Sequence, residues 1–365
     1  MFFELSSAVL TKTLGVRINY LTAKFSDCYE LSNQLREGLN TLKTYIMSKE
    51  TYNKIGSSAS DIPKNGWVDR FIPKHFRPYV RLARLDRPIG TWLLLFPCWW
   101  SITVAWTNWD VFGEIIYLMA AFGIGAIIMR GAGCTYNDIM DRDFDAKVAR
   151  TKDRPLPSAQ LKIEKAILFL ITLLLFGSLI LLTFNSFAIY FGVASLILVF
   201  SYPLMKRITF WPQLFLGFTF NWGAFLGWAA VRGQIDQPAI LLYIGGVFWT
   251  LGYDTIYAHQ DRKDDIVAGV KSTARRLGLG SKPWLFGFYT GAVSLFTLAG
   301  ITAKLSWPFY LGLFLGAIQL FWQVHKVEIN NPKDCLTKFK SNRLFSWIFL
   351  VGIVLAQIHS LNYSV

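Results

Sequence analysis

Two clusters of aspartates follow hydrophobic stretches of this 365-residue chain that are long enough to cross a bilayer. The first cluster lies within residues 137–145 and the second within 254–265. A carboxylate near the centre of a membrane costs roughly 2.5–3.5 kcal/mol on insertion scales, so such groups usually mark sites that bind or react. The two clusters are therefore the first candidates for a functional site.

The spacing of the first cluster predicts a line of carboxylates along one helix. At 100° per residue, Asp138, Asp141 and Asp145 fall within about 60° of one another. Asp143 points away from this line and is an ordinary ion-pair candidate. The first cluster thus predicts three carboxylates on a single face.

The second cluster repeats this pattern along one helix. Asp254, Tyr257, Asp261 and Asp265 then share a stripe of about the same width, with Asp254 about 10 Å below Asp261 along the helix. Asp264 is again set aside as an ion-pair candidate.

Oxygen ligands on two opposed faces suit a hard cation. Mg²⁺ keeps several waters and is bound by one or two carboxylates together with substrate phosphates, so the clusters predict a Mg²⁺-diphosphate site. The alternative is solvated acids that cap helix ends and pair with Arg142, Arg262 and Lys263, but two coherent stripes favour the metal. The predicted metal-binding and catalytic residues are Asp138, Asp141, Asp145, Asp261 and Asp265.

Basic segments follow both clusters, and a third lies between them, at 150–157, 271–278 and 202–207. Arg binds phosphate oxygens through a two-pronged fork and Lys as a point charge. The alternative for each base is membrane topology or lipid head groups, which suffices for Arg275, Arg276 and Lys282. The predicted diphosphate-binding residues are Asn137, Arg150, Lys152, Lys206, Arg207 and Lys271.

Membrane helices must position these residues. Hydrophobic residues make up 53% of the chain and charged residues only 16%, whereas soluble domains carry roughly a quarter charged residues. Apolar stretches without two-residue alternation predict an all-α, polytopic membrane protein with about nine helices around a central cavity. The stretches are 88–106, 111–134, 165–184, 187–204, 212–231, 238–258, 284–303, 306–324 and 344–361.

The net charge of +14 does not indicate nucleic-acid binding, because Lys and Arg crowd alternate loops. The loops that hold or follow the two clusters are rich in basic residues, whereas the intervening loops hold only Arg232 and Lys304. This asymmetry places both clusters on the cytoplasm-like or matrix side of the membrane.

Residues 1–70 differ from the rest and predict a transit peptide with a disordered linker, followed by a membrane domain at 71–365. Residues 1–25 hold Lys12, Arg17 and Lys24 against a single acid, Glu4, as mitochondrial transit peptides do. The alternative is a plain disordered or amphipathic tail. The four cysteines form no CxxC pair, so no disulfide framework or zinc site is predicted.

At these motifs the chain resembles the UbiA superfamily of intramembrane aromatic prenyltransferases, and most closely its 4-hydroxybenzoate branch in ubiquinone biosynthesis. The family motif NDxxDxxxD corresponds to residues 137–145 and the motif DxxxD to 261–265. The matching region runs from about 80 to 280. Its further matching segments are 84–92, 150–157, 202–207, 211–213 and 221–224.

The resemblance implies a Mg²⁺-dependent transfer of a polyprenyl chain from polyprenyl diphosphate to the 3-position of 4-hydroxybenzoate. It also implies a multi-pass protein of the mitochondrial inner membrane, with its active site facing the matrix, that associates with other enzymes of ubiquinone biosynthesis. The metal and the bases would stabilise the departing diphosphate. Aromatic faces would attract the allylic cation, although simple packing is the alternative for each of Trp92, Phe96, Trp99, Trp100, Phe218, Phe220, Trp222 and Tyr257.

An aromatic acceptor needs a cation for its carboxylate and polar groups near its ring. Asn221 lies in mid-span and either faces the cavity or makes an interhelical hydrogen bond. Asp254 either orients the phenol or pairs with a base. The predicted acceptor-binding residues are Arg84, Arg87, Arg154, Asn221, Asp254 and Tyr257.

Two other functions stay open at this point. A related transferase would use haem, naphthoate or homogentisate as its acceptor. A secondary transporter would bind coupling cations, but transporters place such acids near the midplane of the membrane, whereas these clusters lie at one membrane face.

Overall fold

The computed structural model of the protein describes residues 60–63, 65–148 and 150–363. Asp61–Val365 form one compact unit. The predicted transit peptide lies outside the described residues. This unit includes Asp61 and the short helix α2 (Trp67–Phe71), and the predicted boundary between residues 70 and 71 stays a prediction.

Long helices build the described part of the chain, which contains no strand. Eight of them are long and apolar enough to cross a membrane, and α4 is a shorter apolar helix of 17 residues. The predicted all-α, polytopic fold is confirmed, with nine as an approximate number of spans. The long helices are α4 (Ile89–Ala105), α5 (Phe112–Asp145), α6 (Ile163–Leu181), α7 (Ser186–Ile208), α8 (Pro212–Arg232), α9 (Gln237–Ala258), α12 (Ser281–Thr302), α13 (Trp307–Lys326) and α14 (Pro332–Tyr363).

Local sequence defines where these helices begin and end. The Asn185 side chain accepts a 2.9 Å hydrogen bond from the Ala188 backbone N–H and caps α7. Helix α8 starts at Pro212, where the missing N–H is not needed, and ends at Gly233, whose φ of 65° is left-handed. The boundaries of the spans therefore follow from short-range chemistry.

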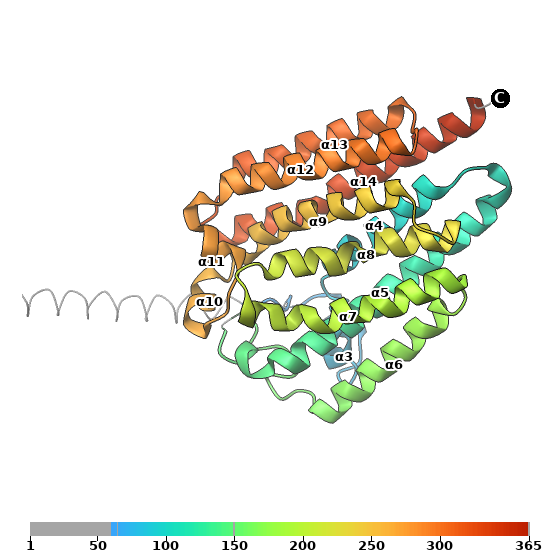
Figure 1. Ribbon diagram of the computed structural model, residues 1–365. Helices are drawn as coiled ribbons and strands as arrows, with labels where there is room; N and C mark the ends of the chain where they lie inside the picture. The colour runs from blue at the N-terminus through green and yellow to red at the C-terminus, as the bar shows by residue number, and fades with distance from the viewer. Residues whose placement is uncertain (1–59, 64, 149, 364–365) are drawn as a thin grey trace, which may run out of the picture. The chain divides into compact units, whose positions relative to one another are not determined.

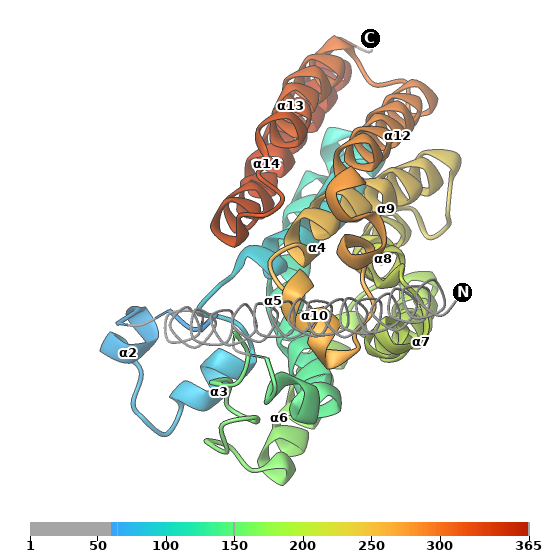
Figure 2. The same ribbon diagram turned by 90° about the vertical axis from the view of Figure 1, so that its left-hand side faces the viewer.

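The long helices pack in sequence order. Each contacts the next one along the chain, and α14 returns to α4 to close the arrangement. Helix α4 also contacts α8 and α9, so it packs across the centre. Figures 1 and 2 show α12, α13 and α14 on one flank and α5, α6 and α7 on the other.

Burial separates inner helices from helices that face lipid. In the most apolar segment of α9, 67% is buried within the protein, against 6% in α6. Trp249 and Tyr253 of α9 are fully buried and belong to the same core as Trp100 of α4. Leu168 and Leu175 of α6 are exposed, as expected of a surface that faces hydrocarbon. The core thus lies around α4 and α9, which border the acidic clusters.

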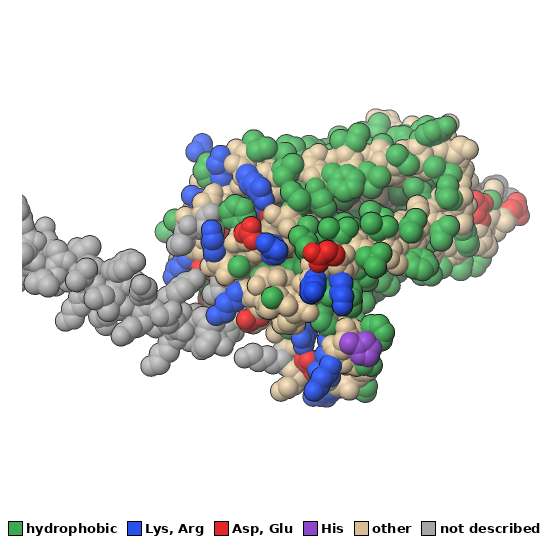
Figure 3. All heavy atoms as spheres, turned by 90° about the horizontal axis from the view of Figure 1, so that it is seen from below, with side chains coloured by type: hydrophobic (Ala, Val, Ile, Leu, Met, Phe, Trp, Pro, Cys, Tyr) green, Lys and Arg blue, Asp and Glu red, His purple; other side chains and the backbone are tan. Residues whose placement is uncertain are grey.

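The charged residues gather at one end of this unit. The short helices α10 (Arg262–Ala268) and α11 (Thr273–Leu277) lie there. Seen from below, Lys and Arg side chains concentrate toward this end, whereas hydrophobic side chains cover most of the remaining flank (Figure 3).

The second acidic cluster does not lie on one continuous helix, so that expectation was wrong. Helix α9 ends at Ala258, and Asp261 is the N-cap residue of α10. The Gln260 side chain donates to the Tyr257 carbonyl over 3.1 Å and the Gln260 backbone N–H donates to the same oxygen. These bonds occupy the carbonyl that the next helical N–H would need, so Asp254 and Asp265 belong to different helices.

Candidate active site

Helix α5 carries the first cluster. The helix extends beyond the predicted span to Asp145, so the motif continues the membrane helix in regular geometry. Asp138 and Asp141 are fully buried, and the Asp145 side chain is 13% exposed. The three carboxylates therefore share one helix, and each needs a cationic partner, because a buried unpaired charge is costly.

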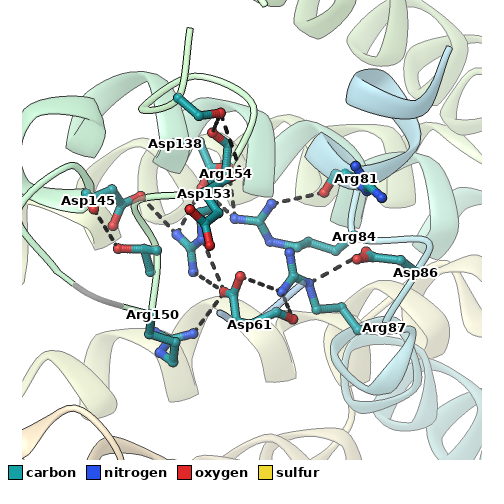
Figure 4. A network of polar contacts seen from close by, with 12 residues as sticks. Asp61, Arg81, Arg84, Asp86, Arg87, Asp138, Asp145, Arg150, Asp153 and Arg154 are labelled. Carbon is teal, nitrogen blue, oxygen red and sulfur yellow. Dashed lines mark hydrogen bonds and ion pairs between the residues drawn. The ribbon is translucent and has the colours of Figure 1, made fainter. Parts of the chain in front are cut away.

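Two arginines neutralise Asp138. Arg84 Nη2 lies 2.6 Å from Asp138 Oδ1 and 2.8 Å from Oδ2, and Arg154 Nη1 lies 3.2 Å from Oδ1 (Figure 4). Arg154 Nη1 also donates to Asp145 Oδ2 over 2.8 Å. Arg154 thus bridges two carboxylates of the first cluster.

Arg84 reaches Asp138 from a constrained turn between α3 (Arg77–Leu82) and α4. Its φ of 58° is in the left-handed region, which a residue with a Cβ adopts at a cost of about 1–3 kcal/mol, most often at functional sites. The turn is stabilised by a 3.1 Å bond from the Leu85 N–H to the Val80 carbonyl. The strained backbone directs the guanidinium toward the acidic helix.

Asp141 has a separate set of partners on α7. Lys206 Nζ donates to Asp141 Oδ2, and Arg207 Nη2 lies 3.6 Å from Asp141 Oδ1. Arg207 is exposed, donates to the Met140 carbonyl over 3.0 Å and covers the Phe144 ring. The basic segment at 202–207 therefore contacts the first cluster, and its role in diphosphate binding stays a prediction.

Arg150 follows the first cluster in the sequence and pairs with the second cluster in the structure. Its Nε and Nη2 each lie 2.6 Å from an oxygen of Asp261, which is a two-pronged pair. Its Nη1 donates to the Tyr257 hydroxyl over 3.3 Å. Burial opposes the charge of Arg150, but Asp261 outweighs it and raises the pKa of Arg150 well above its usual value. A residue that trails the first cluster thus holds the second one.

The Asp265 carboxylate forms no ion pair with an arginine among the described residues, although Arg275 Nη1 donates to the Asp265 carbonyl over 3.2 Å. Its Oδ2 accepts a 3.1 Å hydrogen bond from the Ser272 hydroxyl. Burial, together with the nearby Asp261 carboxylate, raises the pKa of Asp265 to about 7. A carboxyl group that ionises so reluctantly gains from a nearby cation.

Asp61 is a functional candidate that the sequence reasoning missed. Its Oδ2 accepts hydrogen bonds from Arg150 Nη1 over 2.9 Å and from Arg154 Nη2 over 2.9 Å, and Arg87 Nη1 lies 2.7 Å from Oδ1 (Figure 4). Burial alone would raise the pKa of Asp61, but the guanidiniums of Arg154, Arg150 and Arg87 hold it below its usual range. Asp61 lies within the segment predicted as a linker, where no motif singled it out.

Arg87, a predicted acceptor-binding residue, is incompletely satisfied. Its Nη1 donates to the Asp61 carbonyl, while Nε and Nη2 are buried without a hydrogen bond to any described residue. The neighbouring Asp86 carboxylate lies 3.5 Å from Arg87 Nε, and neither of its oxygens is hydrogen-bonded in the described part. Burial, more than the neighbouring Arg84, lowers the pKa of Arg87.

Arg130 of α5 is the second residue that the sequence reasoning missed. Its Nε is buried without a hydrogen bond among the described residues, and its guanidinium covers the Phe220 ring at 5.2 Å. A Cβ at Gly90 would come within 2.6 Å of Arg130 Nε, so glycine there leaves room for the guanidinium. Arg130 interacts electrostatically with Asp254. An arginine inside the predicted span 111–134 was itself a signal.

Other predicted residues have structural partners. Asn221 is buried and donates to the Gly217 carbonyl and the Thr250 hydroxyl, each over 2.8 Å, which matches the interhelical alternative. Lys271 Nζ donates to the Ile208 carbonyl over 2.9 Å. Lys152 is exposed, and Asn137 is half-buried on α5 beside Asp138. The arginines and aspartates of the site thus pair with one another, whereas these four residues lie outside their ion pairs.

Some of the aromatic candidates pack in the core, and others lie beside the arginines of the site. Phe96 and Trp100 are fully buried in the main core. Trp222 packs against Phe191 at 5.8 Å between ring centroids. Phe220 is the candidate beneath the Arg130 guanidinium, and the Tyr257 ring lies 5.8 Å from the Arg150 guanidinium.

The donor set fits Mg²⁺ by its chemistry. The acids of both clusters offer only oxygen ligands, and Asp141 Oδ1 is buried without a hydrogen bond to a described residue. Within the described ranges, no three acidic, His or Cys side chains are arranged to hold a metal by themselves. Mg²⁺ that keeps waters and binds a diphosphate needs only one or two carboxylates, so the arrangement suits a metal delivered together with its anion.

Known proteins share this sequence and fold. The UbiA prenyltransferase family matches residues 94–351. The mitochondrial 4-hydroxybenzoate polyprenyltransferase of Arabidopsis thaliana is 50% identical over 81% of this chain and 72% of its own. The human protein of the same name is 47% identical over 78% of this chain and 77% of its own.

Two solved structures share the fold at low identity. A UbiA homologue from Aeropyrum pernix K1 superposes with a TM-score of 0.61 at 22% identity, over 73% of this chain and 97% of its own. A UbiA homologue from Archaeoglobus fulgidus, bound to GPP and Mg²⁺, gives 0.55 at 16% identity over 77% and 99%. By its family match and its relatives, this chain belongs to the UbiA prenyltransferase family of membrane enzymes.

Proposed function

We propose that this enzyme transfers a polyprenyl chain from polyprenyl diphosphate to the 3-position of 4-hydroxybenzoate in ubiquinone biosynthesis, with Mg²⁺ as its cofactor. The observation that carries the proposal is a pair of arginines that share the Asp61 carboxylate: Arg150 pairs with Asp261 of the second cluster, and Arg154 pairs with Asp145 of the first. Two acidic clusters with arginines between them supply what a metal-bound diphosphate needs. The relatives named for this reaction support the choice of acceptor.

The charged residues act on the leaving group. The C–O bond between the allylic carbon and the diphosphate breaks, and negative charge develops on the departing oxygen. Arg84, Arg150, Arg154 and Lys206 provide fixed positive groups around it, which is electrostatic stabilisation by preorganised donors. Mg²⁺, when bound, adds Lewis-acid neutralisation of the same charge. Asp138, Asp141, Asp145, Asp261 and Asp265 would hold it.

Residues deeper in the helices would bind the aromatic acceptor. A new bond forms between the allylic carbon and the ring carbon ortho to the phenol, and the ring carbon then loses its proton to the released diphosphate. Arg130 suits the acceptor carboxylate better than Arg84 or Arg154, because its Nε is buried without a hydrogen bond among the described residues, whereas these two pair with Asp138 beside the proposed diphosphate site. The Asp254 carboxylate interacts electrostatically with the Arg130 guanidinium. Asp254 would orient the phenol. Phe220 would face the allylic cation.

The mitochondrial names of the relatives and the apolar helices support a multi-pass location in the mitochondrial inner membrane. The end that carries the acidic clusters also carries basic loops, so it would face the matrix.

Membranes that contain the expressed chain test this function directly. They are incubated with Mg²⁺, polyprenyl diphosphate and labelled 4-hydroxybenzoate, and the extracted lipids are analysed for a prenylated aromatic acid. Parallel reactions with labelled homogentisate or naphthoate identify a different acceptor, and a chelator tests the metal. Folded protein that forms no prenylated 4-hydroxybenzoate would refute the proposal.

A further inference from the structure

Asp61 lies outside both acidic clusters and before the first membrane helix, yet it contacts the arginines of the site. Its backbone N–H donates to the Arg150 carbonyl over 3.0 Å, and its carboxylate accepts from Arg150 and Arg154 over 2.9 Å each. Its side chain is 12% exposed. A loosely attached surface acid would not make this many contacts.

Each of the two arginines has a second carboxylate partner in the clusters. Arg150 pairs with Asp261, and Arg154 pairs with Asp138 and Asp145. Asp61 is thus the partner that both arginines share, and it belongs to neither family motif (Figure 4).

The difference between the cluster carboxylates and Asp61 matters when a metal binds. A carboxylate held by a guanidinium has part of its lone pairs occupied, so the arginine and a cation compete for it. When the cluster carboxylates turn to a cation, Arg150 and Arg154 lose those partners, and a buried charge without a partner is strongly destabilising. Asp61 is the anion that can stay in place during this exchange.

We infer that Asp61 is a positioning residue that holds Arg150 and Arg154 beside the diphosphate while the cluster carboxylates bind Mg²⁺. The inference rests on the proposed function. Without the Asp61 charge, both arginines depend on Asp261, Asp138 and Asp145 alone and compete harder with the metal. The same geometry offers an opposite alternative, in which Asp61 occupies the place of the substrate anion and its removal makes binding tighter.

Direct metal binding distinguishes the two. Purified protein is titrated with Mn²⁺, followed by electron paramagnetic resonance, in the presence of an unreactive prenyl thiodiphosphate. Asp61→Asn should raise the Mn²⁺ concentration for half-saturation about tenfold, within the range measured for coupled residues of one ion-pair network. Asp61→Glu, which keeps the charge, should stay close to wild type.

Asp69→Asn is the matched control. Asp69 pairs with Arg77 and Arg81 in the same N-terminal part of the unit, outside the site, at 3.6 and 2.5 Å. It should leave Mn²⁺ binding unchanged.

The outcomes distinguish a failure of the inference about Asp61 from a failure of the proposed function. Unchanged or tighter Mn²⁺ binding in folded Asp61→Asn overturns the positioning role. Asp61→Ser is a second charge-removing variant, which provides the measurement if Asp61→Asn does not fold. Failure of both to fold overturns the inference, because Asp61 would then be a structural anion for Arg87, Arg150 and Arg154. Wild-type protein that binds no Mn²⁺ with the thiodiphosphate refutes the proposed metal site itself, and Asp138→Asn provides the reference for that result.

Discussion

Replacing Arg150 by Lys is the sharpest test of the proposed active site. The substitution keeps the positive charge and removes the planar fork, which Lys cannot reproduce. The Arg150 fork makes two hydrogen bonds of 2.6 Å to Asp261. The substitution is therefore expected to remove the two-pronged hydrogen bonding and to keep the net charge.

The magnitude follows from the fork, because in the proposed exchange its two bonds pass from Asp261 to the diphosphate. Hydrogen bonds to charged groups contribute about 1.5–3 kcal/mol each. Lys retains one of them, and the lost bond and the misplaced charge together weaken transition-state binding by about 3 kcal/mol. Since 1.36 kcal/mol is a factor of ten in rate, kcat/KM for polyprenyl diphosphate should fall about a hundredfold.

The assay is steady-state prenyl transfer in membranes, with polyprenyl diphosphate varied at saturating Mg²⁺ and 4-hydroxybenzoate. Arg142→Lys is the control in the same stretch of chain, because Arg142 pairs with Asp143 at side-chain exposures of 47% and 82%. Exposed pairs contribute about 0–1 kcal/mol, so this variant should stay close to wild type. Folded Arg150→Lys with wild-type kcat/KM would refute the assignment of Arg150 to the diphosphate.

Three further outcomes are expected. Asp138→Ala and Asp261→Ala should each abolish turnover while the protein still inserts in membranes, and near-normal activity in both would remove the metal assignment. Arg130→Gln should raise KM for 4-hydroxybenzoate and leave KM for polyprenyl diphosphate unchanged, and a rise in both would show a general structural role. Asn221→Ala should lower the free energy of unfolding of the purified protein by about 1 kcal/mol, because the Thr250 hydroxyl loses the Asn221 donor and keeps its bond to the Tyr253 hydroxyl, while a large fall in kcat with normal stability would place Asn221 at the acceptor.

Hydropathy predicted the membrane helices well because lipid leaves only one solution for the backbone. Each predicted stretch overlaps a long helix, and the ends differ by a few residues except in α5 and α14. Helix α5 continues to Asp145 beyond its apolar part, since regular backbone hydrogen bonding does not require apolar side chains. The stripe of Asp138, Asp141 and Asp145 was accessible from periodicity alone for the same reason.

The second cluster shows where periodicity stops being informative. The predicted stripe from Asp254 to Asp265 assumed an unbroken helix, but bonds from Gln260 to the Tyr257 carbonyl end α9. Such competition between a side chain and the backbone depends on the local rotamer, which the spacing of residues does not reveal. Asp61 was unpredictable for a different reason, since Arg150 and Arg154, the two partners that link it to the clusters, lie about ninety residues further along the chain.

The partners of the acids also explain why an apolar chain tolerates them. Asp138 is held by Arg84 and Arg154, Asp141 by Lys206, and Asp261 by Arg150. A buried pair of this kind is weak evidence for stability, because well-packed apolar residues would often stabilise a fold as much or more. Strain at Arg84 adds to the cost. A site that is expensive for folding, and whose acids are held by Arg and Lys without substrate, fits the proposed function as one whose pairs exchange partners when a metal and its diphosphate enter.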